Sequence, residues 1–231
     1  MEISKFYYIN LDKRPVRNEH FLNECAREGV PAEKIHRFSA LDGETHNFTQ
    51  QEMKLFEKSD ILSHWFGKRI IGNQLSHYYI MRDIVKNKYP VSVIFQDDAI
   101  LRNGFMVELQ NVIDNMPKNT EMLNIGFHTF ASGANFVRWD LTSRDDHLKL
   151  AQKRLNKHVC VLKHGINPCS LAYILTLRGA ENMCRYFETN GFERATDGNF
   201  NDYLEKRELF YGSTPVLVTG NSDLQSDIFI R

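Results

Sequence analysis

Residues 91–99, Val-Ser-Val-Ile-Phe-Gln-Asp-Asp-Ala, constrain the fold of this chain more than any other stretch. An apolar run rich in β-branched and aromatic side chains is typical of a buried strand in a parallel sheet, because helices cover both faces of such a sheet. Asp97 and Asp98 follow that run directly, and open α/β sheets bind their ligands at the carboxyl ends of their strands. Adjacent carboxylates repel each other, so a divalent cation with oxygen ligands is the simplest group to hold them. The alternative is that the pair caps a helix or lies in a solvated turn.

Strand-like and helix-like segments alternate along the rest of the chain. Further strands are predicted at residues 5–10, 34–40, 122–126, 159–162, 171–176 and 215–219. Helices are predicted from Val16 to Gly29, from the capping box at 49–52, over 73–86, 104–116 and 177–189, and from Asn201. The polar segment 129–157, which contains Arg144-Asp-Asp146, is predicted to be a loop with solvated charges. This order predicts one α/β domain over residues 1–231, with a mostly parallel central sheet flanked by helices.

Charge and cysteine content narrow the class of protein. The 29 basic and 29 acidic residues cancel, so the sequence gives no support to nucleic-acid binding. No apolar run is long enough to span a bilayer, and the first residues do not resemble a signal peptide. The cysteines show no Cys-x-x-Cys spacing and indicate a reducing compartment rather than a disulfide framework or zinc site: Cys25, Cys160, Cys169 and Cys184. We therefore expect a cytoplasmic protein with no transmembrane segment.

Several stretches, in order along nearly the whole chain, carry a family resemblance. They are Tyr8-Ile-Asn-Leu-Asp-Lys-Arg-Pro-Val-Arg17, Arg37-Phe-Ser-Ala-Leu-Asp-Gly43, Gly72-Asn-Gln-Leu-Ser-His77, Ile94-Phe-Gln-Asp-Asp-Ala99, Ala172-Tyr-Ile-Leu-Thr-Leu-Arg-Gly-Ala180, and Pro215 through Ser226-Asp-Ile228. Together they resemble glycosyltransferase family 25, the lipooligosaccharide and procollagen galactosyltransferase group. The order and spacing of these stretches make the resemblance more specific than any one match.

The resemblance implies a GT-A fold, in which a Rossmann-like sheet binds a sugar nucleotide. It implies metal-dependent transfer of a hexose, with galactose the first choice, from a UDP-sugar to a hydroxyl. It also implies that the transfer inverts the configuration of the anomeric carbon. The implied cofactor is Mn²⁺ or Mg²⁺, and the implied acceptor is a glycan, as in lipopolysaccharide biosynthesis, or a hydroxylated protein. The carboxylates that end the central strand agree with this implication, because a metal bridging carboxylate and diphosphate stabilises the leaving group.

The resemblance also suggests roles for individual residues. Those expected to bind the donor are Asn10, Leu11, Arg14, Arg17, Asp42, Gly72, Gln74, Ser76, His77, Gln96 and Asp97, and those expected to hold the metal are Gln96, Asp97 and Asp98. Asp197 is the expected general base and Asp202 the second choice. Asp223 and Asp227, near the late Ser-Asp segment, are candidates for metal or acceptor binding. Other interpretations stay open: solvated arginines at a helix start, simple turns at Asp42 and Asp197, and a buried histidine at 77.

Gln96 departs from the Glu-Asp-Asp segment of the family. If strand geometry persists to Asp98, the side chains of Gln96 and Asp98 point one way and that of Asp97 the other. Gln96 would then share the metal-binding face with Asp98. A glutamine oxygen can ligate a hard cation or bond a ribose hydroxyl, but it brings no charge.

Two other functions compete with the transferase. A sugar-nucleotide or glycan-binding module of the same fold with little catalysis is the first, because Gln96 removes a negative charge from the metal site. A phosphotransfer enzyme of the haloacid dehalogenase type is the second, since it also ends a strand in an acidic pair. It ranks lower because no Asp-x-Asp occurs there and the other stretches stay unexplained.

Overall fold

A computed structural model describes residues 1–127, 151–165, 169–221, 223–224 and 227–228. In this part of the chain the strands form one eight-stranded sheet and one three-stranded sheet. The order across the large sheet is β2 (Ile35–Ser39), β1 (Lys5–Asn10), β3 (Val91–Gln96), β9 (Ala172–Thr176), β5 (Met122–Asn124), β10 (Tyr211–Ser213), β8 (Val159–Leu162) and β7 (Ala151–Arg154). The small sheet is ordered β4 (Ala99–Leu101), β11 (Val218–Gly220) and β6 (Gly126–Phe127).

Six of the eight strands in the large sheet run in one direction. β1 is parallel to β2 and β3, β5 is parallel to β10, and β9 lies antiparallel between β3 and β5. β8 runs antiparallel to both β10 and β7. The predicted α/β fold with a mostly parallel central sheet flanked by helices is therefore confirmed. The sequence did not indicate that β9 would be inserted antiparallel beside the central strand.

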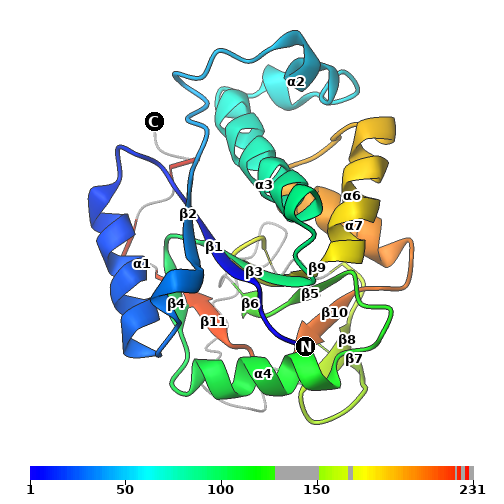
Figure 1. Ribbon diagram of the computed structural model, residues 1–231. Coiled ribbons are helices and arrows are strands. Elements are labelled where there is room, and N and C mark those ends of the chain that lie inside the picture. The colour runs from blue at the N-terminus through cyan, green and yellow to red at the C-terminus, as the bar shows by residue number, and fades with distance from the viewer. Residues whose placement is uncertain (128–150, 166–168, 222, 225–226, 229–231) are drawn as a thin grey trace.

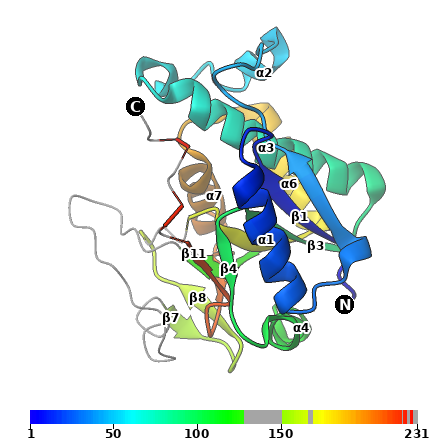
Figure 2. The same ribbon diagram turned by 90° about the vertical axis from the view of Figure 1, so that its left-hand side faces the viewer.

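Helices cover both faces of the large sheet (Figure 1, Figure 2). Their bounds are α1 (Pro15–Arg27), α2 (Gln50–Lys54), α3 (Gly67–Asn87), α4 (Phe105–Asn115), α6 (Leu177–Asn190) and α7 (Thr196–Glu205), with short 3-10 turns η1 (Ala32–Lys34) and η2 (Ile61–Ser63). The capping box predicted at Thr49 and Glu52 is present at the start of α2. No helix in the described ranges is both long and apolar enough to cross a bilayer.

Aromatic side chains attach the helices to the sheet. Tyr8 of β1 stacks on Phe21 of α1, and Phe95 of β3 lies between Phe21 and Phe105 of α4, with ring centroids 4.7–5.9 Å apart. Tyr7 points the other way, because successive strand side chains face opposite sides of the sheet. Its hydroxyl donates to Asp83 of α3 at 2.5 Å. Helices α1 and α4 therefore pack on one face of the sheet, and α3 packs on the other.

Some predicted boundaries are wrong. α3 begins at Gly67 rather than at 73, and α7 begins at Thr196 rather than at 201. The strand predicted at 215–219 is β11, which begins only at Val218, and a further strand, β10, precedes Pro215. β7 occupies part of the predicted loop 129–157, while Arg144-Asp-Asp146 lies outside the described residues. Local patterns fail at these ends because tertiary packing, rather than sequence period, decides where a helix or strand stops.

Two glycines let the chain after β2 pack directly on α3. A Cβ atom at Gly72 would collide with the backbone oxygen of Leu41, and one at Gly43 would collide with the backbone oxygen of Lys68. The Ser76 hydroxyl adds a hydrogen bond from the Leu41 N–H at 3.0 Å. Backbone-to-backbone contact therefore holds residues 41–43 against the helix, and it sets the position of Asp42.

We predict that Gly72→Ala lowers the free energy of unfolding by about 1–2 kcal/mol, because overpacking a backbone contact outweighs the helical preference of alanine. Gly198→Ala is the matched control, since Gly198 is also helical but a Cβ there meets only the Arg194 side chain. The control should be neutral, or more stable by about 0.5–1 kcal/mol. Urea unfolding of the three proteins measures both effects. Equal stability of the two variants would contradict the proposed role of Gly72.

Candidate active site

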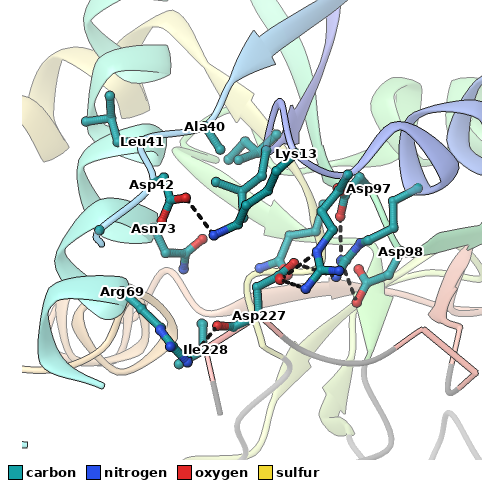
Figure 3. Close-up of a pocket in the computed structure, with 16 residues that line it drawn as sticks. Lys13, Ala40, Leu41, Asp42, Arg69, Asn73, Asp97, Asp98, Asp227 and Ile228 are labelled. Atoms are coloured by element: carbon teal, nitrogen blue, oxygen red, sulfur yellow. Dashed lines mark hydrogen bonds and ion pairs between the residues drawn. The ribbon is translucent and has the colours of Figure 1, made fainter. Parts of the chain in front are cut away.

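A cavity of about 190 Å³ opens at the carboxyl ends of β1, β2 and β3. This is the edge of an open α/β sheet where ligands are expected to bind. Its lining comes from the end of β1, the start of α1, the chain after β2, the first turns of α3, the end of β3 and the C-terminal segment: Ile9, Leu11, Lys13, Arg14, Arg17, Ala40, Leu41, Asp42, Gly43, Arg69, Asn73, Gln96, Asp97, Asp98, Asp227 and Ile228. Figure 3 shows these side chains.

Arg17 holds the acidic pair at the end of β3. Its guanidinium forms ion pairs with Asp97 and, at 3.4 Å, with Asp98, and its side chain is only 11% exposed. Asn10 at the end of β1 donates a second hydrogen bond to Asp97, at 2.6 Å. Burial raises the pKa of Asp97, and the charge of Arg17 and the Asn10 hydrogen bond offset that rise only in part. In this structure a guanidinium is therefore the positive group that the adjacent carboxylates require.

One oxygen of the acidic pair is left for a ligand. Asp98 Oδ1 is buried and has no hydrogen-bond partner. The described residues contain no group of three or more histidine, cysteine or acidic side chains that could enclose a metal ion. Mg²⁺, however, is commonly held by one or two carboxylates together with substrate phosphates and water. The donor set therefore fits a cation that arrives with a diphosphate.

The predicted orientation of Gln96 is wrong. β3 ends at Gln96, and Asp97 and Asp98 lie in a turn, so strand alternation does not continue through the pair. Both aspartates consequently reach Arg17, whereas the Gln96 amide nitrogen donates to Ser170 Oγ at 2.9 Å. Gln96 lines the cavity and ties the end of β3 to the residues before β9. The strand alternation from which a shared face of Gln96 and Asp98 was predicted therefore stops at Gln96.

Basic side chains surround the cavity. Arg14 pairs with Asp227, and Lys13 Nζ lies 2.6 Å from Asp42 Oδ2. Arg69 Nε donates to Glu44 at 2.7 Å. These three residues and Arg17 come from the start of α1 and the first turns of α3. Four cationic side chains around one cavity can contact a polyanion such as a diphosphate.

Three predicted donor contacts face the protein interior instead. Ser76 donates to the Gly72 carbonyl at 2.7 Å, and the Gln74 side-chain oxygen accepts from Asn199 at 3.0 Å. His77 is fully buried, with Nδ1 2.8 Å from the Tyr173 hydroxyl, and burial lowers its pKa to about 3. His77 is thus neutral at physiological pH. None of these three side chains lines the cavity. They lie behind its wall, where Ser76 bonds the Leu41 N–H, instead of contacting the space where a donor would bind.

The two candidate bases lie on different sides of α7. Thr196 accepts a hydrogen bond at 3.0 Å from Asn73, which lines the cavity, and Asp197 is the next residue. Asp197 also accepts from the Gly198 N–H at 3.0 Å, as a helix-start aspartate does. Asp202 pairs with Arg194 at 3.0 Å and is 38% exposed. The structure therefore brings the start of α7 beside the cavity.

Sequence reasoning missed Lys13, Arg69 and Asn73 as lining residues. Lys13 lies within the Tyr8–Arg17 stretch that carried the family resemblance, so that stretch could have indicated it as a lining residue. Arg69 and Asn73 are one helical turn apart and share a face. That signal was lost because the helix was predicted to begin only at residue 73.

Residues 3–197 match the family described as glycosyltransferase family 25 (LPS biosynthesis protein), and this chain belongs to that family. No curated protein matches the sequence. Among solved structures, mouse xyloside xylosyltransferase 1 in its apo form is 8% identical, with a TM-score of 0.43 over 90% of this chain and 84% of that one. A glycosyltransferase involved in glycosylation of the major capsid of PBCV-1 is also 8% identical, with a TM-score of 0.36 over 80% and 66% of the two chains.

We predict that Asp97→Asn becomes more stable relative to the parent as pH rises from 4 to 7 in the absence of ligand and metal. Since the pKa of Asp97 is raised in the folded state, its ionisation costs the parent stability once pH passes the ordinary carboxyl value of about 4. Urea unfolding at several pH values measures the difference. Asp114→Asn removes an exposed carboxylate and is the control for the general effect of losing one acidic group. If the stability of Asp97→Asn relative to the parent fell as pH rises, the pKa of Asp97 would not be raised in the folded protein.

Proposed function

We propose that this glycosyltransferase is a metal-dependent, inverting enzyme that moves a hexose, galactose in the first instance, from a UDP-sugar to a hydroxyl of a glycan or hydroxylated protein. The observation that carries the proposal is the cavity at the ends of β1, β2 and β3, where basic side chains face the Asp97–Asp98 pair. A sugar nucleotide combines a nucleoside, which needs a partly apolar wall, with a diphosphate, which needs cations. The cavity offers both.

The nucleoside end of the donor fits the wall formed by Leu11, Leu41 and Asp42, and the diphosphate fits Arg14 and Arg17. Asp97 and Asp98 would hold Mn²⁺ or Mg²⁺, with further ligands from phosphate and water. When bound, the cation supplies charge stabilisation for the departing diphosphate. Arginine adds to this stabilisation, because its planar fork matches phosphate oxygens.

The transfer itself breaks the bond between the anomeric carbon and the diphosphate oxygen and forms one to the acceptor oxygen. The acceptor loses its hydroxyl proton, and the leaving diphosphate keeps the electron pair of the broken bond. Asp197 is the proposed base for that proton, because the start of α7 adjoins Asn73 at the cavity. Attack opposite the leaving group inverts the anomeric centre.

One observation favours a second candidate, a donor-binding module with little catalysis. Arg17 already pairs with both carboxylates, and the Gln96 amide nitrogen donates to Ser170. Measuring donor hydrolysis with Mn²⁺ separates the two candidates, because a module binds the UDP-sugar but releases no UDP.

We expect UDP to raise the melting temperature substantially only when Mn²⁺ or Mg²⁺ is present, since a ligand that binds only the native state stabilises it. Thermal unfolding with UDP, with Mn²⁺, with both and with EDTA measures this. Asp98→Asn should abolish the metal-dependent part of the shift, because it removes a charged oxygen that has no other partner. Equal shifts for UDP with and without metal would rule out a metal bridge.

We expect Asp197→Asn to lower the turnover number by about 10²–10⁴-fold with UDP affinity nearly unchanged, as loss of a general base does. Asp202→Asn is the matched control on the same helix, and it should retain near-parental turnover because Asp202 pairs with Arg194 at the surface. Steady-state transfer kinetics and UDP titrations supply both readouts. A slow Asp202 variant beside a normal Asp197 variant would transfer the role to Asp202.

A further inference from the structure

Arginines at the cavity converge on one residue near the C-terminus, Asp227. Arg14 Nε donates to Asp227 Oδ1 at 2.7 Å, with a second and shorter contact from its Nη2. Arg17 Nη1 donates to Oδ2 at 3.3 Å, and Arg69 Nη1 reaches the backbone oxygen of Asp227 at 3.5 Å. Figure 3 shows Asp227 between Arg69 and the acidic pair. The Asp227 side chain is 19% exposed and therefore sits within the cavity rather than at its outer rim.

The charges of this cluster do not leave room for a further anion. Arg14, Arg17 and Arg69 supply three positive charges, and Asp97, Asp98 and Asp227 supply three negative ones, so the cluster carries no net charge. A diphosphate that entered with all these partners in place would meet a neutral cluster whose guanidinium groups are already engaged. Carboxylate and phosphate present similar oxygen pairs to arginine, so one can replace the other.

We propose that the Asp227 carboxylate occupies the position of the donor diphosphate in the empty protein and competes with it for Arg14 and Arg17. This inference rests on the proposed function, in which the cavity takes a diphosphate. Its consequence is a reduced apparent affinity for any diphosphate, because only molecules in which Asp227 has released the arginines can bind. Removing the charge of Asp227 also leaves Arg14 and Arg17 balanced by Asp97 and Asp98, so the cluster can stay folded without it.

The test is a calorimetric titration of the full chain with inorganic pyrophosphate in EDTA and, separately, with UDP, first in EDTA and then with Mn²⁺ in its place. Asp227→Asn keeps the size of the side chain and removes its charge, and Asp227→Ser is a second variant should the amide perturb folding. Both should bind pyrophosphate about tenfold more tightly than the parent or better, because the charged hydrogen bonds of Asp227 to the arginines no longer have to be broken first. Asp12→Asn, an exposed carboxylate paired with Arg37 outside the cavity lining, is the control and should leave the affinity unchanged.

Unchanged or weaker pyrophosphate binding in both Asp227 variants would overturn the competition. A loss of UDP affinity that appears only with Mn²⁺ present would also overturn it, because Asp227 would then act as a metal ligand. Tighter pyrophosphate binding in EDTA together with no UDP binding to any of the proteins, even with Mn²⁺ present, would support the competition and refute the UDP donor. Equal UDP binding by the parent and both variants would support the donor and refute the competition.

Discussion

The burial of adjacent carboxylates at the end of a core strand is the constraint on which the rest of the site depends. Asp97 and Asp98 are 5% and 7% exposed, and two such charges are tolerated only beside a positive group. Arg17 meets that need from the first turn of α1, and its ion pairs fix the start of this helix against the end of β3. The same guanidinium reaches Asp227, so one side chain joins the beginning, the middle and the end of the chain.

The walls of the cavity are set by contacts that carry no charge. Gly72 lets the chain after β2 lie directly on α3, and Ser76 bonds the Leu41 N–H from below. Asn73, one residue beyond Gly72, connects the cavity to the start of α7 through Thr196. Family membership establishes a glycosyltransferase, and this link places the candidate base on the element that adjoins the cavity.

Under the proposed function, a divalent cation and Arg17 would compete for the same carboxylates. A cation at Asp97 and Asp98 would weaken the hold of Arg17, whose guanidinium could then turn to the diphosphate. The Gln96 side chain is neutral and its amide nitrogen donates to Ser170, so the proposed cation would depend on the two aspartates and the substrate itself for charged ligands. The proposed function therefore implies that donor and cation bind together.

The sequence alone determined the architecture, the central strand and about half of the cavity residues. Apolar composition over residues 91–95 forced a buried strand, and parallel topology then put the residues after β1, β2 and β3 at one edge. Tertiary structure decided what those residues touch. Whether Asp97 and Asp98 share a face depends on where β3 ends, and whether His77 meets the donor or the core depends on how α3 rotates against β9. Such contacts join residues distant in sequence, so local patterns carry no record of them.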